Sequence, residues 1–306
     1  MKKVNLDELL CCPECGGLLL ESKERLKCEA CDKAYAVVNG IPRFVETELY
    51  VENFGFQWNK HKRTQFDNEK KTPSESFLRT IGLSPEVVKD KLVLDAGCGS
   101  GRYSDVINRW GGKVIAMDLS SAVEACYENL GNRGVMVVQG DILKPPLKKE
   151  SFDVVFSIGV LHHTPNTKQA FKSILTLLKP GGHIVIWLYH SYNDDCLRMK
   201  LSKFYRKVTW RLPKRFLYAV SHLAIPYYYL NKIPFLRSIT GRIWHIAEHE
   251  DWRWRVLDTF DWYSPRYQWH HTYTEVWKWF EEEGLVNIRI SEPPVSISAV
   301  KPSNKI

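Results

Sequence analysis

Four cysteines near the N-terminus have the spacing of a metal site. Cys12 and Cys15 form one C-x2-C pair, and Cys28 and Cys31 form a second pair twelve residues further on. Two such pairs can bring four thiolates to the corners of a tetrahedron, which is how proteins hold structural zinc. Four cysteine ligands leave no open position for water or substrate, so we expect a structural rather than a catalytic zinc. Cys11 lies outside this spacing and is not expected to be a ligand.

A second group of residues could hold a nucleotide-like ligand. Gly97, Gly99 and Gly101 alternate directly after a short apolar run that ends at Asp95, and a second apolar run ends at Asp118. A turn rich in glycine lets backbone amides approach a ligand without a Cβ in the way. The two oxygens of Asp118 could accept hydrogen bonds from both hydroxyls of a ribose. The turn lacks the last glycine of the dinucleotide fingerprint G-x-G-x-x-G, which argues against NAD.

Two adjacent histidines are candidates for proton transfer. His162 and His163 follow the fourth apolar run of this region, and the pKa of histidine lies near neutral pH, so either side chain could take a proton from an acceptor. We favour His163 as the residue on the substrate side. The alternative is that one of the pair caps the following turn or contacts a cofactor. His190, His270 and His271 are weaker candidates for the same role.

Residues 91–190 must position these side chains, and they alternate strand-like with helix-like segments. This alternation is typical of a doubly wound parallel sheet. A helix capped by Thr272 or Thr274 and a final hairpin are expected to complete it, so the sequence predicts an α/β fold with a mostly parallel, seven-stranded, Rossmann-like sheet. The expected strands are 91–95, 114–118, 135–138, 152–158, 183–188, 285–290 and 295–300.

The same residues resemble the class I S-adenosylmethionine-dependent methyltransferases, most closely those of ubiquinone and menaquinone biosynthesis. Residues 94–101 are similar to motif I of that family, Asp118 to its ribose-binding acid, and Asp141 with Ile142 to the segment that faces the adenine. The resemblance covers about 91–190 and resumes near 273. It implies S-adenosylmethionine as cofactor, bound by Asp95, Gly97, Gly99, Gly101, Asp118, Asp141 and Ile142.

The segment before this region divides into two parts. Residues 9–44 resemble a small zinc ribbon that is a partner and activator of tRNA and protein methyltransferases. We therefore expect a zinc ribbon at 1–46, a linker and cap segment at 47–90, and a methyltransferase core at 91–190 and 273–306. Family precedent has the cap segment fold across the cofactor, with Trp58 or Phe56 near the sulfonium; simple packing between domains is the alternative.

A predicted helical lid insertion, residues 191–272, carries the excess positive charge of this 306-residue chain. The formal net charge is +8, yet eleven Lys and Arg and no acidic residue lie between Asp195 and Glu248. The insertion also holds six of the eleven tryptophans. Three interpretations are compatible: a cap with its aromatic side chains packed inward, recognition of an anionic or lipid-linked acceptor, and peripheral membrane contact through 198–242.

These patterns favour an enzyme that methylates an oxygen of a small molecule, sugar-like, lipid-linked or quinone-like. An rRNA or tRNA methyltransferase that binds RNA through the ribbon and the basic insertion is the alternative. Nucleic acid is less favoured because the ribbon is not basic, and the complete glycine and acid pattern argues against a non-enzymatic scaffold. There is no apolar stretch of about 20 residues and no apolar secretory segment, so we expect a cytoplasmic protein, with membrane association if the insertion contacts lipid.

Overall fold

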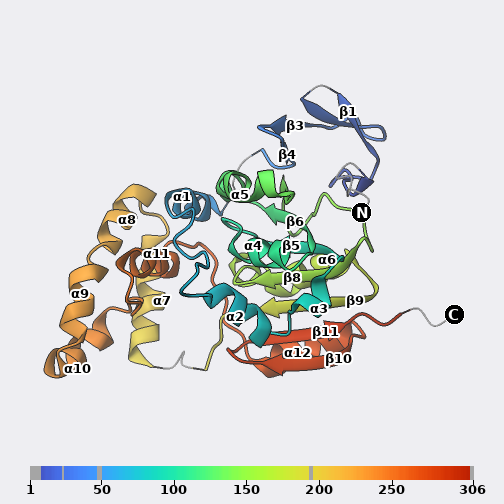
Figure 1. The fold of residues 1–306 in the computed structure, drawn as a ribbon. Coiled ribbons are helices and arrows are strands. Elements are labelled where there is room, and N and C mark those ends of the chain that lie inside the picture. Colours follow the sequence, from blue (N-terminus) through green and yellow to red (C-terminus); the bar gives the residue numbers. More distant parts are fainter. Residues whose placement is uncertain (1–7, 23, 47–49, 193–195, 304–306) are drawn as a thin grey trace.

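The computed structural model describes residues 8–22, 24–46, 50–192 and 196–303, which are organised around one mixed β-sheet (Figure 1). The order of the strands in this described part is β1-β2-β3-β4-β7-β6-β5-β8-β9-β11-β10. Its centre consists of five parallel strands, β5 (Leu92–Ala96), β6 (Lys113–Asp118), β7 (Met136–Gln139), β8 (Phe152–Ile158) and β9 (Leu178–Trp187). The hairpin of β10 (Val286–Ser291) and β11 (Ser296–Val300) adds two strands, and β11 runs antiparallel to β9.

Hydrophobic cores cover both faces of the sheet, because successive side chains of a strand point to opposite sides. In β5, Leu94 belongs to one core and Val93 to the other. The first core is closed by α6 (Thr167–Leu175) and α12 (Tyr273–Glu282). The second is closed by α2 (Pro73–Thr80), α4 (Arg102–Arg109) and α5 (Ala122–Leu130). The predicted cap of α12 is confirmed at Thr272, whose Oγ1 accepts a hydrogen bond from the Glu275 N–H at 3.2 Å.

The N-terminal ribbon extends the sheet beyond the seven strands that the sequence predicts. Its antiparallel strands are β1 (Leu19–Ser22), β2 (Arg25–Cys28), β3 (Ala34–Val38) and β4 (Ile41–Arg43). β4 then pairs in parallel with β7, where Arg43 lies opposite Gln139 and its Nη1 donates to Gln139 Oε1 at 2.9 Å. The described sheet therefore has eleven strands. This one pairing could not be read from the sequence, because it depends on how the ribbon is placed against the core.

Apart from a short helix just before β5, the remaining helices lie beside the carboxyl ends of the parallel strands. α1 (Glu52–Lys60) precedes α2 and α3 (Pro85–Val88), and a 3₁₀ turn at Leu161–His163 follows β8. Between β9 and α12 the chain forms α7 (Leu197–Thr209), α8 (Lys214–Ser221), α9 (Ala224–Asn231), α10 (Pro234–Ile243) and α11 (Trp252–Tyr263), at the left of Figure 1. Across the described ranges, every helix is too short or too polar to cross a lipid bilayer.

Candidate active site

A cavity of about 580 Å³ opens where the parallel strands end. Its floor consists of the turns that follow β5, β6, β8 and β9, and its walls come from α1, α7 and α11. Ligands of open α/β sheets bind at this edge, outside the carboxyl ends of the strands. The volume lies within the range of roughly 300–1,000 Å³ that is usual for small-molecule sites. The cavity is therefore the candidate active site.

The glycine turn after β5 adopts a backbone that only glycine takes without strain. Gly97 has φ +93° and donates its N–H to the Met117 carbonyl at 2.7 Å. A Cβ at Gly97 would lie 2.3 Å from a methyl carbon of Val160, so any larger residue would displace the turn. Gly99 has φ +52° and donates its N–H to Asp118 Oδ2 at 2.9 Å. The turn and the acid at the end of β6 thus hold each other in place.

Asp118 lines the cavity and is held by three hydrogen bonds. Besides Gly99, its carboxylate accepts from the Ser120 N–H at 2.9 Å and from Ser120 Oγ at 2.7 Å. Burial raises the pKa of Asp118, and these hydrogen bonds oppose the rise because they favour the ionised form. Each carboxylate oxygen has more than one acceptor position, so both can still bind the hydroxyls of a ribose. Asp141 and Ile142 line the same cavity.

Two residues expected to bind the cofactor lie behind the turn and do not line the cavity. Asp95 is buried and accepts a hydrogen bond from Ser104 Oγ at 2.7 Å, and burial raises its pKa to about 7. Gly101 allows α4 to approach α5, because a Cβ there would lie 2.7 Å from Leu130. Both residues therefore support the turn from behind, Asp95 through its hydrogen bond with Ser104 of α4 and Gly101 by letting α4 pack closely on α5.

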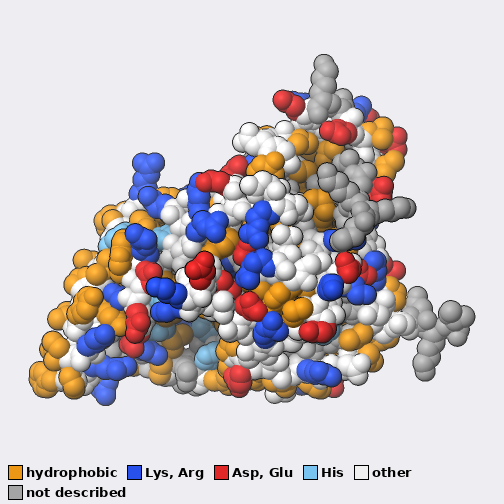
Figure 2. Space-filling model, viewed as in Figure 1, with side chains coloured by type: hydrophobic (Ala, Val, Ile, Leu, Met, Phe, Trp, Pro, Cys, Tyr) orange, Lys and Arg blue, Asp and Glu red, His pale blue; other side chains and the backbone are white. Residues whose placement is uncertain are grey.

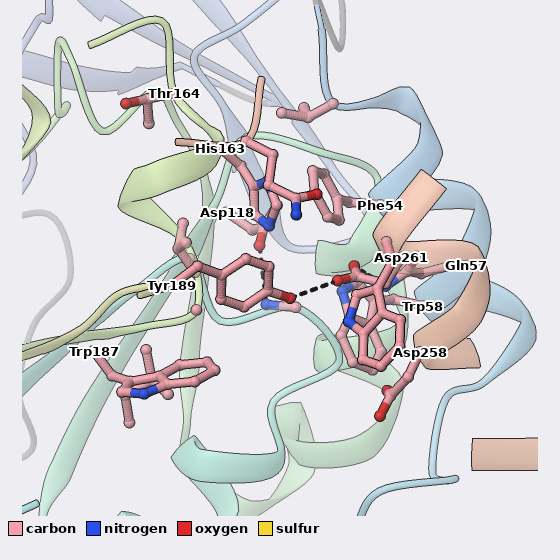
Figure 3. Close-up of a pocket in the computed structure, with 18 of the residues that line it drawn as sticks. Phe54, Gln57, Trp58, Asp118, His163, Thr164, Trp187, Tyr189, Asp258 and Asp261 are labelled. Atoms are coloured by element: carbon pink, nitrogen blue, oxygen red, sulfur yellow. Dashed lines mark hydrogen bonds between the residues drawn. The ribbon is translucent and has the colours of Figure 1, made fainter. Parts of the chain in front are cut away.

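His163 lies in the cavity wall between Phe54 and Tyr189 (Figure 3). Its Nδ1 is 2.8 Å from the carbonyl oxygen of Tyr267. A carbonyl can only accept, so Nδ1 carries the hydrogen and donates it. Burial lowers the pKa of His163, opposed by the charge of Asp261, and the imidazole is therefore neutral at pH 7. Nε2 then carries a lone pair; the atom is buried and has no hydrogen-bond partner among the described residues.

The neighbouring His162 has a different environment. It is completely buried, it is absent from the cavity lining, and its ring stacks on Tyr189 with 4.0 Å between centroids. The structure thus separates the two histidines that the sequence left as alternatives. Among the weaker candidates, His190 and His270 line the cavity, whereas His271 is buried with its Nε2 3.0 Å from Thr167 Oγ1.

A group of polar residues close to His163 was not identified from the sequence. Tyr189 Oη donates to Asp261 Oδ2 at 3.0 Å, and Gln57 Nε2 donates to Asp261 Oδ1 at 3.0 Å (Figure 3). One turn earlier in α11, Asp258 accepts from Gln65 Nε2 at 3.0 Å. Burial, followed by the charge of Asp261, raises the pKa of Asp258 to about 7. The available signal was two acids three residues apart in a helix rich in aromatic residues, a spacing that places them on one helix face.

The structure distinguishes the two aromatic residues proposed for the cap segment. Trp58 lines the cavity beside the glycine turn, where a Cβ at Gly99 would lie 3.0 Å from its Nε1. Phe56 instead packs against Tyr218 and Phe260, with ring centroids 5.6 and 5.9 Å away. Trp58 is therefore the aromatic residue of α1 that lies next to the candidate cofactor site.

A second cavity of about 450 Å³ adjoins the first, and Gln268 and His270 line both. Its other lining residues are cationic or aromatic: Lys203, Arg206, Lys207, Trp210, Arg266 and Trp269. A phosphate or carboxylate group would find donors there. The basic character predicted for the insertion is thus concentrated partly beside the candidate active site.

The four cysteines of the ribbon lie together. Their sulfur atoms are all within 4.8 Å of one another, with Cys12 to Cys31 at 3.6 Å and Cys15 to Cys28 at 3.5 Å. A tetrahedral zinc with bonds of about 2.3 Å separates its sulfur ligands by about 3.8 Å. The donor set and its spacing therefore fit zinc. Cys11 is buried outside this cluster.

The parallel strand order, the glycine turn and an acid at the end of the second strand together define a nucleotide-binding α/β domain of the methyltransferase type. Residues 94–186 match the family model described as methyltransferase domain. The chain therefore contains a methyltransferase domain of the class that uses S-adenosylmethionine.

The curated relatives that match this chain each cover less than half of it. The ubiquinone biosynthesis O-methyltransferase of Ralstonia nicotianae is 35% identical over 33% of this chain and 44% of its own length. The human protein named "Probable tRNA methyltransferase 9B" is 34% identical over 38% of this chain and 25% of its own. A solved complex of a methyltransferase activator with a methyltransferase from Haloferax volcanii is 15% identical, covering 84% of this chain and 99% of the other at a TM-score of 0.48. The chain thus spans less than half the length of these two curated relatives.

Proposed function

We propose that this chain transfers a methyl group from S-adenosylmethionine to an oxygen of a small-molecule acceptor. The observation that carries this proposal is His163, a neutral imidazole in the cavity wall whose buried Nε2 is an acceptor without a hydrogen-bond partner. A hydroxyl acceptor loses its proton when it is methylated, and a base at hydrogen-bond distance can take that proton. His163 is the catalytic residue of the proposal.

The residues on the glycine side of the cavity fit the cofactor. Asp118 would bind the ribose hydroxyls, and the backbone of residues 97–100 would lie along the ligand, since Gly97 and Gly99 present no Cβ. Asp141 and Ile142 would lie at the adenine end, while Asp95 and Gly101 support the turn from behind. When bound, the cofactor supplies a methyl group already activated on a sulfonium. The chain's own task is to align the acceptor and exclude water, to which Trp58 contributes.

The polar group formed by Tyr189, Asp258 and Asp261 favours an acceptor with hydroxyl groups. Asp258 and Asp261 can accept hydrogen bonds from hydroxyls, and Asp258 can also donate when protonated, because burial raises its pKa to about 7. A sugar-like ring offers such hydroxyls, and a hydroxylated quinone-like ring could stack on Tyr189. A phosphate or lipid-linked extension of the acceptor would lie in the second cavity, near Lys207 and Arg266.

RNA is the second candidate for the acceptor. The basic second cavity and the tRNA methyltransferase named among the relatives favour it. However, two carboxyl groups, those of Asp258 and Asp261, line the acceptor side of the first cavity. Carboxylates at the acceptor side repel a phosphodiester backbone. The small-molecule proposal is therefore preferred.

We also propose that Cys12, Cys15, Cys28 and Cys31 hold one structural zinc. The proposed units are the ribbon at 1–46, the cap segment at 47–90, the core at 91–190 and 273–306, and the lid at 191–272. The contacts of α1 and α7 with the cavity support the roles of the cap segment and of the lid, since one helix of each lines it.

Methyl transfer from labelled S-adenosylmethionine into cell extracts, fractionated afterwards into RNA, lipids and small molecules, tests the proposal. We expect label in the lipid or small-molecule fraction with the unchanged chain, and much slower labelling with Asp118→Ala or His163→Ala. Label confined to RNA would establish the second candidate instead. Labelling by His163→Ala at the rate of the unchanged chain would contradict the role of His163.

A further inference from the structure

The helices α7 to α10 expose an unusual amount of apolar surface. Eleven of the twenty large hydrophobic side chains that are exposed in the described part of the chain lie between residues 197 and 243. Monomeric soluble proteins rarely expose contiguous apolar patches of this kind unless they bind something. These residues, which we call the apolar surface, are Leu197, Phe204, Val208, Phe216, Leu223, Tyr229, Leu230, Ile233, Phe235, Ile239 and Ile243.

The side chains of the apolar surface are most regularly spaced on α10. Phe235, Ile239 and Ile243 are 76%, 52% and 50% exposed, and their four-residue spacing places them on one face of the helix. Arg242, seven residues after Phe235, lies on the same face and is also exposed. None of the residues of α10, all of which the structure describes, is buried. The helix is therefore amphipathic, and its apolar face points away from the protein.

Contacts on the inner side of these helices determine which side of them faces outward. The guanidinium of the fully buried Arg255 lies 3.6 Å from the ring centroid of Tyr228, which holds α9 against α11. Tyr227 Oη donates to the Thr240 carbonyl at 2.7 Å and ties α9 to α10. The exposure of the apolar side chains thus follows from packing between helices and not from a detached segment.

The charges around the apolar surface are almost all positive. Eleven Lys and Arg and no acidic residue occur in the sequence between 196 and 247. Lys214 pairs with Glu52, and Arg237 pairs with Glu248. Figure 2 shows hydrophobic side chains along the left end of the molecule, over α8 to α10, with Lys and Arg beside them. Apolar side chains interleaved with cations are the composition of helices that lie in the interface of an anionic bilayer.

We propose that the apolar surface docks this protein on an anionic membrane. Phe235, Ile239 and Ile243 enter the boundary between headgroups and acyl chains, while neighbouring Lys and Arg side chains bind the headgroups. The charge complementarity favours lipid over a second copy of this chain, because two copies facing each other through this surface would bring like charges together.

Docking would also place the active-site cavity close to the lipid. α7 lines the cavity with Arg198, Met199 and Ser202, and exposes Phe204 and Val208 on another face. An acceptor with a lipid tail could then reach the cavity from the membrane. The docking proposal itself does not depend on methyl transfer, since vesicle binding needs neither cofactor nor acceptor.

Co-sedimentation of the full chain with vesicles tests the proposal. One set of vesicles is phosphatidylcholine, and the other contains phosphatidylcholine and phosphatidylglycerol in equal amounts. We expect binding to the anionic vesicles that weakens with salt, and much weaker binding to phosphatidylcholine alone. The double variant Phe235→Ser with Ile239→Ser should bind at least about tenfold more weakly, because two apolar side chains are no longer transferred from water into the bilayer.

The matched control is Ile290→Ser on β10, where the isoleucine is 51% exposed but belongs to the edge strand of the sheet and not to the apolar surface. It should bind vesicles as the unchanged chain does. Failure of the unchanged chain to bind anionic vesicles at low salt would overturn the proposal. So would equal binding by the double variant. A dimer in analytical ultracentrifugation that the double variant converts to monomer, without vesicle binding, would show instead that this surface joins two copies.

Discussion

At the scale of single residues, hydrogen-bond geometry decides the chemical state of the site. The Tyr267 carbonyl fixes the hydrogen of His163 on Nδ1, and the Gly99 and Ser120 donors keep the Asp118 carboxyl group oriented. Preorganised groups of this kind are more effective than mobile ones, because no free energy is spent on orienting them during the reaction.

Removal of the Asp118 carboxylate should weaken cofactor binding. Hydrogen bonds to a charged group contribute about 1.5–3 kcal/mol, so Asp118→Ala should lower the affinity for S-adenosylmethionine by roughly 10- to 100-fold. Isothermal titration calorimetry measures this change. Asp153→Asn is the control, because Asp153 also accepts a backbone hydrogen bond, from the Leu92 N–H at 2.8 Å, but does not line the cavity. Equal affinities for Asp118→Ala and the unchanged chain would contradict the assignment.

The proton-accepting role of His163 predicts a particular pH profile. Only the neutral imidazole can act as a base, and burial lowers its pKa below the ordinary value of 6.5. Activity should therefore be constant at neutral pH and decline on acidification, with a midpoint below pH 6.5. His163→Ala should abolish this limb and reduce kcat by roughly 10²- to 10⁴-fold, with cofactor affinity unchanged.

His222→Ala provides the control for this measurement. The Nδ1 of His222 is also close to a carbonyl oxygen, that of Tyr218 at 2.9 Å, but the residue lies outside the cavity lining. Its replacement should leave the pH profile as it is. A midpoint above 6.5, or an unchanged profile for His163→Ala, would rule out His163 as the base.

At the scale of elements, the steric requirement for glycine in the turn between β5 and α4 can be tested by comparing two glycine positions. Gly97 and Gly134 have similar φ angles, +93° and +85°, but a Cβ would meet Val160 at 2.3 Å only at Gly97. Both alanine variants lose about 1 kcal/mol through backbone strain. Gly97→Ala should lose a further 1–3 kcal/mol through the clash, together with cofactor affinity. Urea unfolding and calorimetry measure both, and equal losses for the two variants would disprove the steric argument.

At the scale of the whole molecule, the ribbon and the core form one structure. Besides the pairing of β4 with β7, the Cys11 N–H donates to the Pro146 carbonyl at 3.0 Å, and Leu19 and Phe44 belong to the same hydrophobic core as Val138. Loss of order in the ribbon would uncover this part of the core. The stability of the core should therefore depend on the metal that we propose for the ribbon.

Elemental analysis should find one zinc per chain. Chelation of this zinc, or Cys28→Ser, should lower the melting temperature of the entire chain by about 5 °C or more, because zinc contributes folding energy and the ribbon packs on the core. Cys196→Ser is the control, since Cys196 is exposed and outside the cysteine cluster. Absence of zinc, or a core that melts at the same temperature after chelation, would contradict this prediction.

Local sequence determined much of this protein. The alternation of apolar runs and helices predicted the parallel strands, with β8 at the expected bounds, and the C-x2-C spacing indicated the cysteine cluster. These features follow from neighbouring residues, because strand periodicity, turns and metal-ligand spacing are local properties of the chain.

Only the tertiary structure decided which side chains share the cavity. His163 was distinguished from His162 by a carbonyl more than a hundred residues away, at Tyr267. The pairing of Tyr189 with Asp261 joins β9 to α11 across the helical segment, and no local pattern predicts it. The same holds for the attachment of the ribbon through Arg43 and Gln139. The reason is physical: burial and hydrogen-bond partners depend on packing between elements distant in sequence, whereas the residue types and their spacing do not.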